Sequence, residues 1–193
     1  MEDKIRKILG GRKKKVITGE ELTPSAVLLP LFRKDSEIHL LFTRRTEEVK
    51  DHKGQISFPG GTQDAEDTSL QTTALRESFE EIGIKSDDVK ILGELDDITT
   101  ITNYRISPFV GIISYPYEFV VNEAEIAELI EVPVSALLDP KIFTEEKAYI
   151  HQGEIYPVYY FNYEDTVIWG ATAKIVKQFL ELIFGWSAEL AES

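Results

Sequence analysis

Short apolar runs separated by polar and glycine-containing turns occupy most of the first 160 positions of this chain. Residues 25–32 and 37–43 predict two strands joined by a polar turn, and Pro30 predicts that the first strand lies at a sheet edge or carries a bulge. Further strands are expected at 55–58, 89–95, 106–114 and 128–132, and a hairpin at 143–150 and 154–161, across the turn at 151–153.

Helical spacing of apolar residues predicts helices at 4–9, 68–82, 133–138 and 171–184. The last of these has one continuous apolar face, formed by Ile175, Phe179, Leu182 and Ile183. Many strands combined with few helices predict an α/β fold in which a mixed sheet lies between helices.

The helix expected at 68–82 forms one unit with the strand and turn that precede it. Gly60 and Gly61 follow a short strand, and glycine allows the backbone to come close to a ligand. Asp67 is a suitable N-cap and Gly83 a suitable terminator for this helix.

Three carboxylates of this helix, those of Glu77, Glu80 and Glu81, fall on one side at about 100° per residue. An apolar stripe on the opposite side, formed by Leu75, Phe79 and Ile82, is expected to anchor the helix while the acidic cluster faces outward. Clustered like charges destabilise a helix, so a bound divalent cation would explain them.

Oxygen ligands at this spacing suit Mg²⁺ or Mn²⁺. Arg76 is placed to pair with Glu80 four residues on. The chain contains no cysteine, which excludes a thiolate zinc site. The alternative interpretation of the glutamates alone is a solvated acidic helix face with surface ion pairs.

Residues 61–84 resemble the Nudix box, whose pattern is Gly-x5-Glu-x7-Arg-Glu-U-x-Glu-Glu-x-Gly-U, where U is apolar. The matching positions are Arg76, Glu77, Glu80, Glu81, Gly83 and Ile84. The chain departs from the pattern in two places: Ser78 occupies the first U position, and the first half reads Gly61-x5-Asp67-x8-Arg76, with aspartate for glutamate and one extra residue.

That longer spacing resembles the coenzyme A pyrophosphatase-like branch of the superfamily. The upstream motif of the same branch is similar to Leu41-Phe42-Thr43-Arg44-Arg45-Thr46, followed by Lys50, Gly54 and Phe58-Pro59-Gly60-Gly61. Thr46 and Lys50 depart from that motif. Residues 168–173 resemble a further signature of the branch, and the likeness extends from about 25 to 182.

The resemblance implies an α/β/α sandwich and a metal-dependent hydrolysis of a diphosphate. It implies Glu77 and Glu81 as core metal ligands, with Glu80 and the Gly61 carbonyl as further ligands and Arg76 orienting the glutamates. The general base of this superfamily often lies beyond the box. Residues 122–128 are acidic here, and Glu125 is the candidate, against the alternative of a solvated acidic segment.

Basic residues gather just before the glycine turn, at Arg44, Arg45, Lys50, His52 and Lys53. They are predicted to hold phosphates, including the 3′-phosphate that distinguishes coenzyme A; a solvated basic loop is the alternative. A second basic cluster, at 12–15, is expected to be a solvated linker. Trp169 is expected to pack in the core.

The 193 residues predict an N-terminal helix with a basic segment at 1–20 and a hydrolase domain at 21–193. A net charge of −13 argues against general nucleic-acid binding. The absence of cysteine, of a secretory signal and of a membrane-span-length apolar run favours a cytoplasmic protein without membrane association. The resemblance also allows a homodimer.

Three functions remain open at this point. The first is hydrolysis of coenzyme A or an acyl derivative to 3′,5′-ADP and 4′-phosphopantetheine or its acyl form. The second is hydrolysis of another nucleotide, such as ADP-ribose or a nucleoside triphosphate. The third is a nucleotide sensor without catalysis, which would be expected to lack box carboxylates; this chain keeps all three.

Overall fold

A computed structural model describes residues 1–193 apart from 20, 49–51, 152–153 and 189–193, and apart from the side chains of 147–151 and 154–155. The helices are α1 (Glu2–Gly10), α2 (Leu70–Ile82), α3 (Val134–Leu137) and α4 (Gly170–Phe184), with 3₁₀ turns η1 (Ser86–Asp88) and η2 (Pro140–Ile142). The strands are β1 (Thr23–Lys34), β2 (Glu37–Arg45), β3 (Ile56–Ser57), β4 (Gly60–Thr62), β5 (Lys90–Glu94), β6 (Ile98–Thr99), β7 (Tyr104–Ile112), β8 (Ile126–Pro133), β9 (Phe143–His151), β10 (Glu154–Tyr163) and β11 (Thr166–Trp169).

Eight of these strands form one large sheet in the described part of the chain, with the order β3-β2-β1-β7-β5 and with β4, β6 and β8 attached to β1, β7 and β2. Strands β1 and β7 are parallel and the other pairs are antiparallel, so the sheet is mixed, as predicted. The predicted hairpin is β9 and β10, which β11 extends into a separate three-stranded sheet. Strand β11 was not predicted.

Pro30 lies on an internal strand of the large sheet and in unbroken register with β7, so the prediction of an edge position or a bulge was wrong. On one side β1 pairs with β7 along its length, including Pro30 with Gly111. On its other side, β4 pairs with residues 25–27 and β2 with residues 31–34. The proline therefore falls where one partner strand replaces the other, and a missing N–H is tolerated there.

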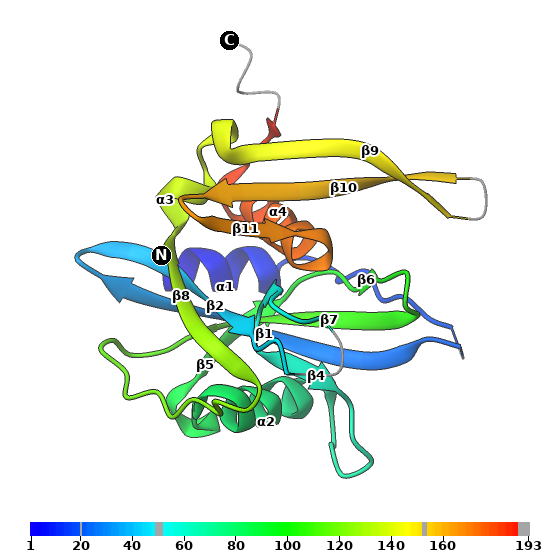
Figure 1. Ribbon diagram of the computed structural model, residues 1–193. Coiled ribbons are helices and arrows are strands. Elements are labelled where there is room, and N and C mark those ends of the chain that lie inside the picture. The colour runs from blue at the N-terminus through cyan, green and yellow to red at the C-terminus, as the bar shows by residue number, and fades with distance from the viewer. Residues whose placement is uncertain (20, 49–51, 152–153, 189–193) are drawn as a thin grey trace.

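Helix α2 covers one side of the large sheet, while α1, α4 and the three-stranded sheet lie on the other (Figure 1). This arrangement confirms the predicted α/β/α sandwich. The predicted apolar face of α4 is buried at Ile175, Phe179 and Ile183, in the same cluster as Ile5 and Leu9 of α1. Among the described residues, no helix is long and apolar enough to cross a membrane.

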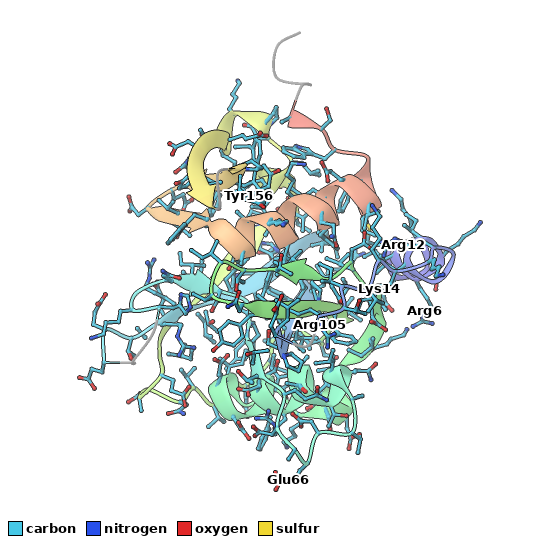
Figure 2. All side chains as sticks on the ribbon, turned by 90° about the vertical axis from the view of Figure 1, so that its right-hand side faces the viewer. Arg6, Arg12, Lys14, Glu66, Arg105 and Tyr156 are labelled. Carbon is cyan, nitrogen blue, oxygen red and sulfur yellow. The ribbon has the colours of Figure 1, made fainter. Side chains whose placement is uncertain are left out.

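The basic segment at 12–15 is docked against the protein, and the expectation of a solvated linker was wrong. Arg12 pairs with Asp96, and Lys14 pairs with Glu94 and Asp97 at 2.8 Å each. Arg12 and Lys14 lie beside α1 in Figure 2. The physical reason is charge complementarity: the end of β5 and the turn that follows it carry the acidic groups that these cations neutralise.

Candidate active site

Helix α2 begins later than expected because Ser69, and not Asp67, caps its N-terminus. The Ser69 hydroxyl accepts a hydrogen bond from the N–H of Thr72 at 3.1 Å. Gly83 ends the helix as predicted, in the left-handed conformation with φ 74°. Its N–H donates to the carbonyl of Phe79 at 2.9 Å, which satisfies an otherwise free carbonyl of the last turn.

The predicted division of α2 into a buried apolar stripe and an outward acidic face holds for Ile82 and Glu80 but is wrong for Phe79 and Glu81. Phe79 is 54% exposed, whereas the Glu81 side chain is only 4% exposed. The buried face of the helix consists of small residues, Ala74 and Ser78, followed by Glu81 and Ile82. Small residues allow the helix to approach β1 and β4 closely, and this rotates Glu81 inward against the glycine turn.

The glycine turn contacts two of the three glutamates. The N–H of Gly60 donates to Oε2 of Glu81 at 3.2 Å. A Cβ atom at Gly61 would lie 2.5 Å from Cδ of Glu77, so only glycine leaves room for that carboxylate. Glu77 and Glu81 are thus brought to neighbouring residues of one backbone turn.

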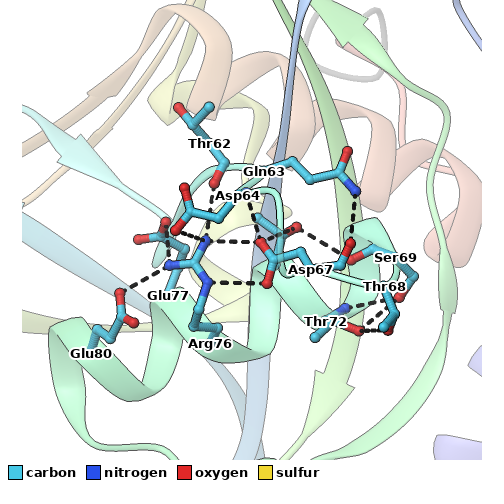
Figure 3. A network of polar contacts seen from close by, with 11 residues as sticks. Thr62, Gln63, Asp64, Asp67, Thr68, Ser69, Thr72, Arg76, Glu77 and Glu80 are labelled. Atoms are coloured by element: carbon cyan, nitrogen blue, oxygen red, sulfur yellow. Dashed lines mark hydrogen bonds and ion pairs between the residues drawn. The ribbon is translucent and has the colours of Figure 1, made fainter.

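Arg76 is the centre of the polar network shown in Figure 3. Its guanidinium pairs with Glu80 at 3.0 Å, as predicted, and with Glu77 at 2.9 Å. It also donates twice to Asp67, from Nε to Oδ1 at 3.1 Å and from Nη2 to Oδ2 at 3.0 Å. A further bond to the carbonyl of Thr62 at 3.0 Å ties Arg76 to the end of β4.

The electrostatics of the buried carboxylates are unfavourable without a further cation. Burial raises the pKa of Glu81 to about 8, and the neighbouring charges of Glu77 and Glu125 act in the same direction. The Gly60 N–H and Arg45, whose Nη1 lies 3.4 Å from Oε1 of Glu81, compensate only in part. Burial also raises the pKa of Glu77.

The predicted phosphate-binding residues have different surroundings. Arg45 lies beside Glu81, while Arg44 pairs through Nε with Glu128 at 2.9 Å. Lys50 lies outside the described residues.

The predicted base, Glu125, is half-buried and accepts a hydrogen bond from the side-chain amide of Asn122 at 3.0 Å. The N–H of Asn122 donates to the carbonyl of Glu81 at 2.9 Å, so this loop is fixed next to the last turn of α2. That contact keeps Glu125 in the same neighbourhood as the box carboxylates.

Across the described residues, no three side chains of the carboxylate and imidazole type already converge on a point that would hold a metal ion. Glu80 is turned toward Arg76 and is 53% exposed. The donor chemistry nevertheless fits a hard divalent cation, because Glu77 and Glu81 offer partly desolvated carboxylate oxygens beside the Gly61 backbone. A cation there would remove the cost of ionising Glu81.

Two residues have surroundings that sequence reasoning missed. Asp67 was interpreted as a helix cap, but it forms an ion pair with Arg76, nine residues later. This pair closes the loop between β4 and α2. Trp169 was expected in the core, yet it is 42% exposed. Strand alternation would have indicated this, because Ile168 beside it is fully buried.

Comparison with known proteins assigns the chain to a family. The NUDIX domain matches residues 22–159. The chain belongs to the Nudix family. A Nudix hydrolase from Photorhabdus laumondii, NudL, described as uncharacterized, is 36% identical over 159 residues, which span 82% of this chain and 84% of that protein. NudL from Yersinia enterocolitica, also described as uncharacterized, is 37% identical, over 82% and 80% of the two chains.

Solved Nudix structures share the fold. The structure of a MutT/nudix family protein from Enterococcus faecalis has a TM-score of 0.53 at 12% identity, over 94% of this chain and 73% of that one. The NUDIX domain of Shewanella oneidensis NrtR, solved with ADP ribose, has a TM-score of 0.50 at 17% identity, over 62% and 78%. The NUDIX domain match and the Nudix hydrolase relatives make this protein a pyrophosphohydrolase, a class of enzyme that generally uses divalent metal ions.

Proposed function

We propose that this Nudix enzyme hydrolyses the diphosphate linkage of coenzyme A or an acyl-CoA, releasing 3′,5′-ADP and 4′-phosphopantetheine or its acyl form. The observation that carries the reaction is the approach of Glu77 and Glu81 to consecutive glycines, Gly60 and Gly61. Burying two carboxylates beside a backbone turn lowers the stability of the folded protein. A cation-dependent reaction on an anionic substrate explains why the chain keeps them there.

Glu77 and Glu81 would hold Mg²⁺ or Mn²⁺, with Glu80 and the Gly61 carbonyl as further ligands. When bound, such a cation neutralises phosphate charge and lowers the pKa of a coordinated water. Glu80 would have to leave its pair with Arg76 to take part, and its exposure makes such a rotation inexpensive. Arg76 orients the glutamates, and Asp67 in turn holds Arg76 in place.

The other proposed roles fall on residues around Glu81. Arg45 donates to a phosphate of the substrate, and Arg44 and Lys50 supply further positive charge. Glu125 accepts the proton of the attacking water, and its amide partner Asn122 fixes the orientation of the carboxylate. The N–H of Asn122 donates to the Glu81 carbonyl, and this bond holds Glu125 at a fixed position relative to the carboxylates of Glu77 and Glu81.

Coenzyme A is favoured as the substrate by the upstream motif that ends in the glycine turn. Arg45, which stands at a variable position of this motif, lies beside Glu81 of the carboxylate site. ADP-ribose or a nucleoside triphosphate is the second candidate, since the Shewanella NUDIX domain of similar fold was solved with ADP ribose. Thr46 and Lys50, which depart from the motif, are the residues that favour this alternative.

A substrate panel tests the proposal. The purified enzyme is incubated with coenzyme A, acetyl-CoA, ADP-ribose and ATP, each with Mg²⁺ or Mn²⁺, and the products are resolved by mass. We expect 3′,5′-ADP and phosphopantetheine from coenzyme A. Cleavage of ADP-ribose with coenzyme A untouched would replace the first candidate with the second. Tight nucleotide binding without turnover under any condition would indicate a sensor.

A further inference from the structure

A hollow on the surface lies where the three-stranded sheet meets the loop before β3. Its volume is about 580 Å³. Its lining includes Arg44, Lys53, Ile56, Tyr160, Asp165 and Trp169. The three-stranded sheet thus contributes aromatic and apolar side chains, and the segment around β2 and β3 contributes cations. The hollow combines the two chemical features that a nucleotide presents to a protein, a flat ring and a phosphate.

An aromatic platform forms one wall. Trp169 and Tyr160 are paired residues of β11 and β10, and their rings are nearly parallel, with centroids 6.5 Å apart and planes inclined by 14°. Strand alternation buries Ile168 completely and leaves Trp169 and Val167 exposed, at 42% and 46%. Exposing a tryptophan is costly in solution, and a stacked ligand ring would offset that cost.

Two cations also line the hollow. Lys53 is exposed and has no ion-pair partner within the described ranges of the chain. Arg44 pairs with Glu128, whose side chain is more than half exposed, so that pair is weak and easily exchanged for a phosphate. Asp165 also lines the hollow and is an acceptor for the exocyclic amine of a purine.

The chain connects the hollow to the proposed reaction site at two places. Arg44 lines the hollow, and the next residue, Arg45, contacts Glu81. Ile56 of β3 also lines the hollow, and Gly60 of the glycine turn is four residues after it in the chain. Because consecutive residues of a strand face opposite sides, a ligand in the hollow would have to pass the end of β2 to reach the carboxylates.

We propose that this hollow is the base subsite of the enzyme: a purine stacks on Trp169 and Tyr160, and a phosphate on its ribose is bound by Lys53 and Arg44. The inference rests on the proposed function, since it assigns one end of the coenzyme A molecule to this hollow. It also places the diphosphate on the side of Arg45. The pantetheine arm is then directed away from the three-stranded sheet.

The chain carries a built-in probe for this subsite, because it contains only two tryptophans. Trp186 is 5% exposed, and its Nε1 donates to the carbonyl of Leu138 at 3.1 Å, so it is shielded from solutes. Trp169 is therefore the tryptophan whose fluorescence a ligand in the hollow would change. The titration is done without divalent metal, using 3′,5′-ADP, AMP, adenosine and pantetheine separately.

Saturable quenching by 3′,5′-ADP is expected, with AMP binding several-fold more weakly and pantetheine giving no response. The Trp169→Phe variant, which retains Trp186, should show no fluorescence change. A flat titration with 3′,5′-ADP, or a response to pantetheine in its place, would overturn the assignment. This measurement requires no turnover, so it is independent of whether coenzyme A is the substrate.

Kinetics supply the second measurement. Trp169→Ala should raise KM for coenzyme A about tenfold with kcat nearly unchanged, the size of effect expected for one stacked base. Lys53→Ala should raise KM several-fold for coenzyme A but not for 3′-dephospho-CoA. Lys7→Ala, an exposed lysine of α1, is the matched control and should change neither value.

The two proposals fail in different ways. Quenching by 3′,5′-ADP without hydrolysis of coenzyme A would remove the proposed substrate and leave the base subsite standing. Hydrolysis of coenzyme A with unchanged KM in both variants, together with a flat titration, would remove the base subsite and leave the substrate.

Discussion

Arg76 and Asp67 form a two-bond pair, with both guanidinium–carboxylate distances close to 3 Å, and this pair closes the loop between β4 and α2. The Asp67 side chain is almost fully buried, and its bonds with Arg76 lower its pKa to about 2. Because Arg76 also contacts Glu77 and Glu80, the position of the box carboxylates depends on an aspartate that is not itself a proposed ligand.

Replacing Asp67 with asparagine should therefore reduce activity through Arg76. One N–H of Arg76 would face an amide nitrogen that cannot accept its hydrogen bond. We expect kcat to fall about tenfold or more and the free energy of unfolding to fall by about 1–3 kcal/mol. Steady-state kinetics and denaturant unfolding measure the two effects.

Asp64→Asn is the matched control for that change. Asp64 also pairs with Arg76, but at 3.5 Å and with a largely exposed side chain, so its loss should change stability by less than about 1 kcal/mol. Equal effects of the two substitutions would show that Asp67 has no special role.

Glu81→Gln should abolish metal-dependent turnover and leave the protein folded. The glutamine keeps an oxygen that can accept the Gly60 N–H, and it removes a charge that is costly to bury. We expect kcat to fall by at least about 100-fold, since a proposed cation ligand is lost. Hydrolysis assays and circular dichroism check the two parts, and a variant that keeps most of its activity would disprove the assignment.

The elements that sequence predicted well are those whose pattern is local. Apolar spacing located the helix ending at Phe184, and Gly83 marked the end of α2, because the left-handed terminator is a property of a single residue. The likeness to the Nudix box then identified residues around Gly61 that periodicity alone would have left as a turn with an acidic helix.

The failures concern residues whose environment is set by distant parts of the chain. Phe79 is apolar and correctly spaced for a core position, yet the close packing of Ala74 and Ser78 against the sheet turns it to solvent. Lys14 looks like part of a solvated basic run until Asp97, more than 80 positions later, is placed beside it. Sequence spacing carries no information on such long-range partners.

The pH dependence of stability follows from Glu81. Its pKa is about 8 in the folded protein and near 4.5 in the unfolded chain, so the folded state holds an extra proton between these values. The stabilisation of the folded state by this extra proton is complete below about pH 4.5 and is lost as the pH rises toward 8. In metal-free buffer, a loss of about 3–4 kcal/mol between pH 5 and 8 would lower Tm by about 6–16 °C.

Thermal unfolding in a chelating buffer, measured at several pH values, checks this dependence. The Glu81→Gln variant lacks the titrating group and should show a flatter profile than the unmodified protein. Added Mg²⁺ should stabilise the protein more at pH 8 than at pH 5, because cation binding favours the ionised carboxylate. A Tm of the unmodified protein that is constant or rises over this range would contradict the proposed environment of Glu81.

The contact of Lys14 with Asp97 predicts that the N-terminal segment contributes to the stability of the whole protein. Burial opposes ionisation of Asp97, but bonds from Lys14, from the hydroxyl of Ser107 at 2.6 Å and from the N–H of Ile17 outweigh it and lower its pKa. Asp97→Ala leaves the Ser107 hydroxyl and the Ile17 N–H without this acceptor and removes one of the two carboxylate partners of Lys14, so we expect the free energy of unfolding to fall by about 2–4 kcal/mol. Glu94→Gln, at an exposed partner of the same lysine, should change it by less than about 1 kcal/mol. Denaturant unfolding of the two variants measures the difference, and equal effects of the two substitutions would contradict the buried role of Asp97.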